Sequence, residues 1–366
     1  MRYLNIAMDL ELFLDILNID STSGKEAVLA DYLAERLSAE RNRVVMSDVG
    51  DGTKNLFVAW GDPKIVFCTH LDTVPPYIAP SFDGEIVSGR GSCDAKGQIF
   101  AMYEACKVLE SRGYEGFGLL LLAGEETGSF GAKAFREHHP GAEWVVVGEP
   151  TDNCMASASK GTKSFEVTFE GRSFHSGYPQ YGLSAVEMFN DFVNALRSIV
   201  FPLDPILGDT TWNIGKLVSD NPQNILSDRL TCRVYFRTTF ESDEMVCNVM
   251  KNIAGENARL RFGRRKVQDG SDIVAKDVAQ WQKMMSVKPF GGDTPTKYEI
   301  LDGFPSKPVA FGSDAPQLTN FRRKILCGPG SILVAHRPEE HISLADLETA
   351  IENYVRIYET LVNFKN

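Results

Sequence analysis

Residues 119–129 read LLLLAGEETGS, and this stretch decides the fold class. A short apolar run without polar alternation is typical of a strand that is buried on both faces, as in a parallel sheet covered by helices. The run passes directly into two adjacent carboxylates, Glu125 and Glu126. Ligands bind at the carboxyl ends of strands in open α/β sheets. The stretch therefore predicts a buried strand with a functional site at its end.

The sequence on both sides alternates similar apolar runs with amphipathic segments. We expect strands at residues 55–60, 65–68, 118–123 and 144–147, and helices at residues 10–17, 26–37, 97–111 and 344–362. Ser343 is the expected N-cap of the last helix. This alternation predicts an α/β domain with a mixed, mostly parallel sheet covered by helices.

A different pattern begins near Thr162, where the strands alternate polar and apolar residues. The expected order is a strand at 163–171, a helix at 184–198, strands at 210–219 and 229–240, a helix at 243–256 and a strand at 258–263. This order is typical of the split α+β sandwich of ferredoxin-like domains. Beyond Gly270 we expect a helix at 274–285 and a strand at 308–311. The sequence thus predicts a discontinuous domain of residues 1–161 and 269–366, with residues 162–268 inserted into it.

Composition excludes several classes of protein. The net charge of -11, from 49 acidic and 38 basic side chains, argues against a nucleic-acid or anionic-membrane partner. No apolar run approaches the ~20 residues of a membrane span, and acidic residues interrupt the N-terminal apolar stretch where a signal peptide needs continuity. The 7 cysteines form no Cys-x-x-Cys pair, which argues against a disulfide framework and favours the reducing cytoplasm.

Two further polar residues end the stretch KIVFCTHLD, namely His70 and Asp72. A carboxylate beside a histidine can accept its second ring N–H and fix the tautomer that binds metal. A histidine in an ordinary turn is the alternative interpretation. Asp94, in the glycine-rich turn GRGSCDAKG, is short enough to lie between two cations, but aspartate is also a favoured helix N-cap.

The adjacent pair Glu125 and Glu126 repel each other unless a cation, a shared proton or solvent compensates. A metal would resolve this if one glutamate binds the ion and its neighbour takes a proton from water. An exposed acidic loop is the alternative. Glu149 ends the run WVVVGEPT in the same way, and His336 follows the short run SILVA. Imidazole and carboxylate ligands without thiolate suit zinc, cobalt or manganese, and the implied chemistry is hydrolysis.

At these residues the sequence resembles the M20 metallopeptidase family, nearly from end to end. The motifs that carry the resemblance are HLD (70–72), GSCDAKG (91–97), the EE pair (125–126), GEPT (148–151) and AHRPEEH (335–341). The resemblance implies two divalent metal ions, with Zn²⁺ expected and Co²⁺ as the alternative.

Carried over to this sequence, the resemblance also assigns roles. It implies that Asp94 bridges the two ions, that Asp72 orients His70, and that Glu125 is the general base. The remaining ligands would be His70 and Glu149 for one ion, and Glu126 and His336 for the other.

The inserted segment resembles the lid and dimerisation domain of that family. Its FEGRSFHSG stretch implies that His175 reaches the active site of a partner protomer and stabilises an oxyanion; a loop histidine near a turn is the alternative. In the following stretch the resemblance implies that Asn224 binds the substrate carbonyl and Arg237 the substrate carboxylate. Ser227 replaces the usual proline of this stretch. Ser313 implies a substrate contact beside Asp314, which could instead cap a helix.

The resemblance favours an amidohydrolase of amino-acid biosynthesis, including arginine biosynthesis, of the acetylornithine deacetylase or succinyl-diaminopimelate desuccinylase type. We expect it to remove an acyl group, preferably acetyl, from N-acetylornithine, N-acetyl-lysine or N-acetylcitrulline. The alternatives are a desuccinylase or a di- or tripeptidase of the same family. An inactive scaffold is the alternative outside enzymes, although such a protein would commonly lack one or more of the ligands present here.

Overall fold

The computed structural model describes residues 8–253 and 284–364, and these divide into two compact units. The first unit comprises the chain up to Ala158, Lys297–Val309 and the chain from Ser313 onward. The second comprises Ser159–Thr296 and Ala310–Gly312. The predicted strand at 258–263 and nearly all of the predicted helix at 274–285 lie outside the described residues. No helix in the described ranges is both long and apolar enough to cross a membrane.

The first unit contains a six-stranded sheet with the order β1-β2-β6-β3-β7-β15. Its strands are β1 (Arg43–Gly50), β2 (Thr53–Trp60), β3 (Ile65–His70), β6 (Phe117–Leu122), β7 (Trp144–Val147) and β15 (Arg323–Leu326). The β6–β3, β3–β7 and β7–β15 pairs are parallel, whereas β1–β2 and β2–β6 are antiparallel. The predicted class of a mixed, mostly parallel sheet is therefore confirmed.

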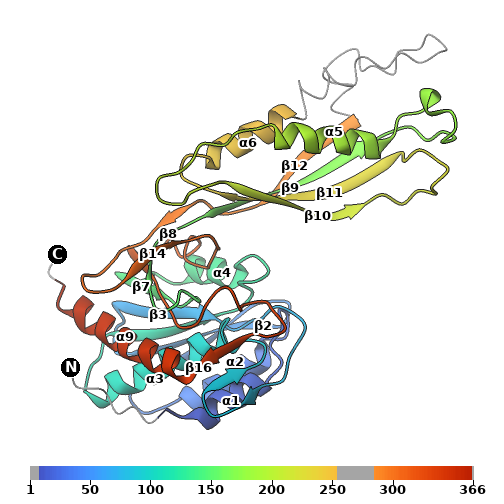
Figure 1. The fold of residues 1–366 in the computed structure, drawn as a ribbon. Helices are drawn as coiled ribbons and strands as arrows, with labels where there is room; N and C mark the ends of the chain where they lie inside the picture. Colours follow the sequence, from blue (N-terminus) through green and yellow to red (C-terminus); the bar gives the residue numbers. More distant parts are fainter. Residues whose placement is uncertain (1–7, 254–283, 365–366) are drawn as a thin grey trace. The chain divides into compact units, whose positions relative to one another are not determined.

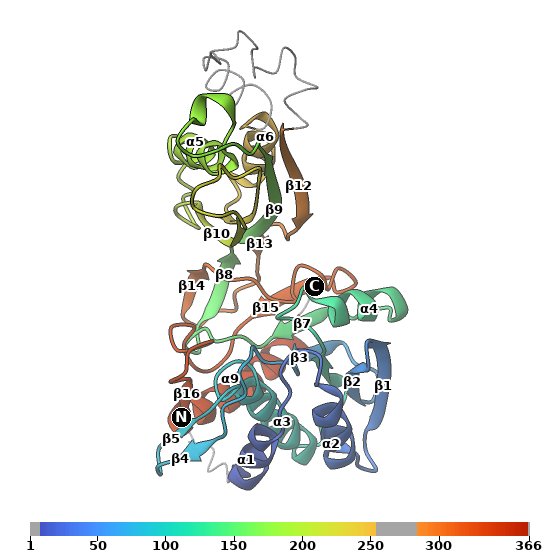
Figure 2. The same cartoon turned by 90° about the vertical axis from the view of Figure 1, so that its right-hand side faces the viewer.

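Helices cover both faces of this sheet (Figures 1 and 2). They are α1 (Leu10–Asn18), α2 (Ala27–Leu37), α3 (Lys96–Ser111), α4 (Phe130–His138) and α9 (Leu344–Val362). Helices α3 and α9 pack side by side on one face, and α4 lies on the opposite face. Ser343 is the N-cap of α9 as predicted, because its side chain accepts a hydrogen bond from the main-chain N–H of Asp346.

Two small sheets flank the large one. One has the order β16-β5-β4, with β4 (Ser81–Phe82), β5 (Ile86–Ser88) and β16 (His341–Ser343). The other has the order β13-β8-β14, with β8 (Met155–Ser159), β13 (Thr296–Lys297) and β14 (Ser306–Val309). The strand expected at 308–311 therefore begins and ends two residues earlier, and it does not join the large sheet.

The second unit is a four-stranded antiparallel sheet with the order β10-β11-β9-β12. Its elements are β9 (Gly161–Glu170), the 3-10 helix η1 (Pro179–Tyr181), α5 (Ala185–Arg197), β10 (Thr211–Val218), β11 (Arg229–Thr238), α6 (Asp243–Asn252) and β12 (Met285–Gly291). Among its described residues, helices α5 and α6 pack on one face, over a core that includes Phe169, Phe192 and Phe236. This is the expected split α+β arrangement.

The edge strand β12 changes the expected domain assignment. Residues 269–366 are predicted to belong to the larger domain, but β12 pairs with β9, and residues up to Thr296 belong to the second unit. The alternating pattern in β12 is interrupted by Pro289, so its pairing partner cannot be recognised from its own residues.

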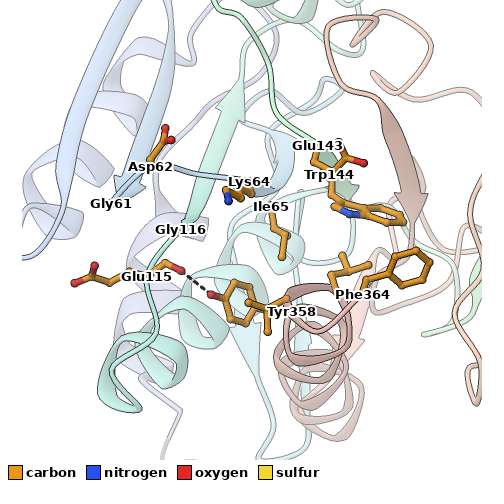
Figure 3. A pocket seen from close by; sticks show the side chains of 12 residues that line it. Gly61, Asp62, Lys64, Ile65, Glu115, Gly116, Glu143, Trp144, Tyr358 and Phe364 are labelled. Atoms are coloured by element: carbon orange, nitrogen blue, oxygen red, sulfur yellow. Dashed lines mark hydrogen bonds between the residues drawn. The ribbon is translucent and has the colours of Figure 1, made fainter. Parts of the chain in front are cut away.

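The parallel strands also explain where the functional residues gather. Because β3, β6 and β7 run in the same direction, the residues that follow them meet at one edge of the sheet. At the opposite edge, where these strands begin, a cavity of about 510 Å³ is lined by Lys64, Trp144, Tyr358 and Phe364 among others (Figure 3). None of the residues that line this cavity is a predicted site residue.

Candidate metal centre

The five predicted metal ligands converge at the carboxyl edge of the large sheet. His70 is the last residue of β3, Glu126 follows β6, Glu149 follows β7, Asp94 precedes α3, and His336 lies in the loop before β16. Their ligand atoms form two overlapping groups in which all atoms lie within 4.8 Å of one another. One group is His70, Asp94 and Glu149, and the other is Asp94, Glu126 and His336.

Asp94 belongs to both groups and lies between the two histidines. Its Oδ1 is 3.1 Å from Nε2 of His70, and its Oδ2 is 3.3 Å from Nε2 of His336. Asp94 is not the N-cap of α3, because that position is Ala95 and no side chain caps the helix. The capping interpretation is therefore wrong, and the geometry is that of a carboxylate able to bridge two ions.

The Asp72 carboxylate is a buried acceptor that holds three separate parts of the site. Its Oδ1 accepts the main-chain N–H of Glu125 at 3.0 Å, and its Oδ2 accepts that of Glu126 at 3.2 Å. The Ser23 hydroxyl donates to Oδ2 at 2.8 Å. Nδ1 of His70 lies 3.5 Å from Oδ1 and 2.9 Å from the main-chain oxygen of Asp72. An N–H on Nδ1 would leave Nε2 as the free nitrogen that faces Asp94.

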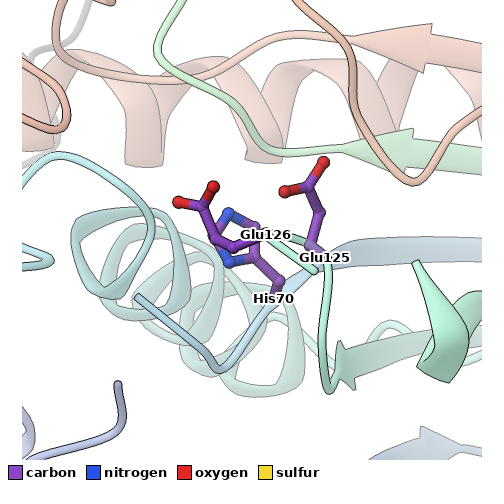
Figure 4. Close-up of side chains that lie close together, drawn as sticks. All are labelled: His70, Glu125 and Glu126. Carbon is purple, nitrogen blue, oxygen red and sulfur yellow. The ribbon is translucent and has the colours of Figure 1, made fainter. Parts of the chain in front are cut away.

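Glu125 and Glu126 are neighbours in the chain but have different surroundings. Oε1 of Glu126 is 2.8 Å from Nε2 of His336. The Glu125 carboxylate lies within 4.8 Å of the ligand atoms of His70 and Glu126, yet no described residue donates a hydrogen bond to it. Figure 4 shows the two carboxylates pointing in different directions above His70. Burial and the nearby charge of Asp314 raise the pKa of Glu125 well above its usual value.

The electrostatics show that this donor set needs positive charge. Burial and the neighbouring Glu125 raise the pKa of Glu149 well above its usual value. Burial alone would lower the pKa of His70, but hydrogen bonds with Asp72 and Asp94 outweigh it and raise that pKa well above the usual value. Hydrogen bonds with Asp94 and Glu126 raise the pKa of His336 to about 10. The buried carboxylates therefore favour a positive charge among them, and these nitrogen and oxygen donors suit zinc.

The two groups differ in exposure. The His70 side chain is 2% exposed, whereas the His336 side chain is 49% exposed. His336 also has a backbone φ of 64°, in the left-handed region that residues other than glycine rarely adopt. The ligand group that contains His336 is therefore the more accessible one, and its loop must hold an unfavourable conformation.

The predicted lid residues lie in the second unit, in two separate places. His175 and Asn224 are both exposed. Their loops adjoin, since the main-chain N–H of Ser176 donates to the main-chain oxygen of Asn224 at 2.9 Å. Arg237 lies near the far end of β11, paired with Thr162 of β9. Arg237 is eight positions along β11 from Arg229, or about 26 Å at ~3.3 Å per residue. Arg237 therefore lies near the end of β11 opposite to the end that leads into the loop of Asn224.

The departure at Ser227 has a structural explanation. Its hydroxyl donates to the main-chain oxygen of Arg229 at 2.9 Å and lies 2.7 Å from the hydroxyl of Ser219. These contacts join both sides of the loop that carries Asn224, so a hydroxyl here constrains the loop by hydrogen bonds, where a proline would constrain its backbone directly.

Ser313 and Asp314 are both buried in the first unit. The Ser313 hydroxyl accepts the main-chain N–H of Ala315 at 3.3 Å. The charge of Asp314 raises the pKa of both Glu125 and Glu149, which places it near the metal ligands. Ser23 was not predicted as a site residue, since it stands in no ligand motif, whereas Asp314 was expected beside the substrate or as a helix cap and not as a charge next to Glu125 and Glu149.

Known proteins are similar to this chain in sequence or in fold. The family model for Peptidase family M20/M25/M40 matches residues 66–360. A probable carboxypeptidase from Aspergillus terreus is 33% identical, over 94% of this chain and 84% of the relative. The crystal structure of a Staphylococcus aureus tripeptidase is similar with a TM-score of 0.77 and 18% identity, covering 97% of this chain and 99% of that one. A Bacillus subtilis protein described as a dinuclear metal binding peptidase is similar with a TM-score of 0.65 and 12% identity, covering 96% and 98%.

The structural neighbours show the fold, and the family assignment rests on the match to residues 66–360 together with the Aspergillus relative. On these two findings the chain is a member of Peptidase family M20/M25/M40, a family of metallopeptidase hydrolases.

Proposed function

We propose that this hydrolase cleaves the amide bond between an acyl group and an amino acid that carries a free α-carboxylate. The observation that carries the proposal is the division between Glu125 and Glu126. Glu126 contacts His336 and Asp72 holds both main-chain N–H groups, while the Glu125 carboxylate remains free beside the ligand cluster. A site that only bound metal would not need this second carboxylate.

In the proposed site His70, Asp94 and Glu149 would hold one divalent cation, and Asp94, Glu126 and His336 would hold the other. We favour Zn²⁺, with Co²⁺ as the alternative, because both accept imidazole and carboxylate ligands. When bound, two such cations polarise a carbonyl and lower the pKa of water. The dinuclear description of the Bacillus relative supports two ions here.

Glu125 moves the proton in this mechanism. Its raised pKa suits a group that accepts a proton from water and passes it to the departing amine nitrogen. Asp72 fixes the position of the Glu125 main chain relative to the His70 ring, since its carboxylate contacts both. Ser313, beside Asp314, would line the substrate pocket.

The second unit would supply substrate-binding groups from two protomers. His175 and Asn224 lie together, whereas Arg237 lies about 26 Å along the sheet from the strand end nearest to them. We therefore propose a homodimer formed through the inserted domain. Arg237 would bind the substrate carboxylate, and the partner's loop would bring Asn224 to the carbonyl and His175 to the developing oxyanion.

The preferred substrate is an N-acetyl amino acid such as N-acetylornithine, N-acetyl-lysine or N-acetylcitrulline, in amino-acid biosynthesis. A second candidate is a short peptide with a free C-terminus, which the names of the probable carboxypeptidase and the tripeptidase favour. Both substrates present the same scissile bond, followed by an α-carboxylate. We place the reaction in the reducing cytoplasm, because all 7 cysteines are free and most are buried.

A substrate panel with metal analysis tests the proposal. The purified chain would be assayed for bound metal and then for hydrolysis of N-acetyl and N-succinyl amino acids and of di- and tripeptides, each with and without chelator. We expect up to two ions per chain, and chelator-sensitive cleavage of N-acetyl amino acids above peptides. Preferred cleavage of peptides would replace the first candidate by the second. A protein without metal and without chelator-sensitive hydrolysis would contradict the proposed function and favour a scaffold.

A further inference from the structure

A buried ion pair lies beside the loop of Asp94, and neither of its residues is a predicted metal ligand or substrate contact. Arg90 and Glu340 are 2% and 1% exposed. Their charged groups meet at 2.5 Å, although the two residues are 250 positions apart in the chain. Buried charges persist only when their remaining hydrogen-bonding groups are also satisfied. The other contacts of this pair therefore show what it holds.

The Glu340 carboxylate is an acceptor for the loop that presents Asp94. Its Oε1 accepts the main-chain N–H groups of Gly91 at 3.0 Å, Cys93 at 3.1 Å and Asp94 at 3.0 Å. Three donors converging on one carboxylate oxygen leave the turn little freedom, because each lost bond would leave a buried N–H unpaired. Glu340 thus sets the position of the Asp94 main chain.

The same pair also holds the segment that presents His336. The guanidinium of Arg90 donates to the main-chain oxygen of Arg337 at 3.3 Å. The main-chain N–H of Glu340 donates to that same oxygen at 3.3 Å. His336 directly precedes this anchored residue and is held at a φ of 64°. The pair therefore connects two ligands of one ion group, Asp94 and His336.

We infer that Glu340, with Arg90, is a positioning residue for the more exposed metal ion, the one assigned to Asp94, Glu126 and His336. The inference rests on the metal centre of the proposed function. Glu340 touches neither metal nor substrate and acts through the main chain of Asp94. Loss of such outer contacts typically lowers metal affinity by 10–100-fold. The ion at His70 and Glu149 should change less, because only Asp94 connects it to the pair.

The test is a titration of the metal-free full chain with Zn²⁺ in competition with a colorimetric chelator. For Glu340→Gln we expect the weaker of two Zn²⁺ ions to lose about 10–100-fold in affinity and the tighter ion to lose less. At saturating Zn²⁺ we expect kcat to recover most of the wild-type value, with KM little changed. A merely structural role would instead lower the thermal stability of the metal-free protein and leave the ratio of the two Zn²⁺ affinities unchanged.

Glu104→Gln is the matched control, because Glu104 is also 2% exposed and ion-paired, with Lys107, but lies away from the Asp94 loop. Its two Zn²⁺ affinities should equal those of the wild type. Glu340→Gln leaves Arg90 without its partner, so the double variant Arg90→Met/Glu340→Gln replaces it if the single variant does not fold. Equal Zn²⁺ affinities, within about twofold, in wild type and in the folded variant would overturn the inference. A wild type that binds no Zn²⁺ would instead overturn the proposed function.

Discussion

The adjacent residues Glu125 and Glu126 share their main-chain anchor and differ only in what their carboxylates meet. Asp72 accepts the N–H of each, so neither can move without the other. Only the Glu126 carboxylate contacts His336. If the proposed roles hold, a substitution at one of the two residues would therefore separate proton transfer from metal binding.

For Glu125→Gln we expect kcat to fall by at least about 10²-fold with metal content unchanged, because the amide cannot accept the proton from water. The matched variant Glu126→Gln should instead lose the ion of the Asp94, Glu126 and His336 group. Turnover on the best substrate and metal content by atomic emission would be measured for both. Near-normal turnover of Glu125→Gln would show that another group is the base.

The titration of His336 predicts that rising pH increases Zn²⁺ affinity and decreases the stability of the metal-free protein. Its pKa of about 10 in the metal-free protein lies above its usual value of 6.5, so at neutral pH it must lose a proton before it binds metal. Zn²⁺ affinity should therefore rise with pH from 7 to 8.5, by up to about tenfold per unit for this proton. The stability that the charged His336 gives the metal-free protein is fully present below pH 6.5 and should be lost as pH rises toward 10.

Chelator-competition titrations at several pH values would give the first quantity, and urea unfolding of the metal-free protein the second. In His336→Gln the pH slope of affinity should decrease at the weaker ion. A wild-type affinity that does not change with pH would contradict the assignment of His336 as a ligand that is protonated in the absence of metal.

At the level of single residues, the sequence predicts what stands at the end of a strand and misses what meets across the chain. His70, Glu126 and Glu149 were predicted to lie together because polar residues directly follow apolar runs, and parallel strands bring them to one edge. The pairing of Arg90 with Glu340 has no local pattern, since it forms only when two loops 250 positions apart meet.

At the level of elements, periodicity identified β2, β3, β6 and β7 with helices α1, α2, α3 and α9, but it missed helix α4 and the edge strands of the large sheet. Strand β1 was missed because it is an exposed edge strand with mixed residues, and β15 because it has only four residues and begins with Arg323 and Lys324. Both pair with strands that were predicted, β2 and β7. Tertiary pairing rather than local propensity makes them strands.

The final helix α9 offers a test of stability at this level. Ser343→Ala removes the side-chain oxygen that accepts the Asp346 N–H at 3.0 Å, and we expect it to lower the free energy of unfolding by about 1 kcal/mol. Urea unfolding of the metal-free protein would measure the change. Thr349→Ala is the control, because Thr349 is exposed on the same helix and caps nothing. Equal stability of Ser343→Ala and Thr349→Ala would contradict the capping role.

At the level of the whole molecule, the predicted site residues lie in both units. The first unit contains the predicted metal ligands and Glu125, and the second contains His175, Asn224 and Arg237. The sequence predicted an insertion but placed its end too early. The strand that completes the inserted sheet, β12, comes later in the chain, and its own residues do not identify it as part of the insertion. Because of the spacing along β11 between Arg237 and the His175 loop, the proposed site draws these residues from two protomers, and activity measurements can test this.

The proposed dimer predicts complementation between two inactive variants. His175→Ala lacks the oxyanion donor, and Glu125→Gln lacks the base, so each homodimer should be nearly inactive. In a heterodimer purified through two different tags, the site with an intact Glu125 would receive His175 from the other protomer. One of its two sites would then be complete, and we expect about half of the wild-type kcat per dimer. A heterodimer of His175→Ala with the double variant His175→Ala/Glu125→Gln has no complete site and is the control. If the first heterodimer is as inactive as that control, His175 acts within its own protomer or not at all, and the two-protomer site is wrong.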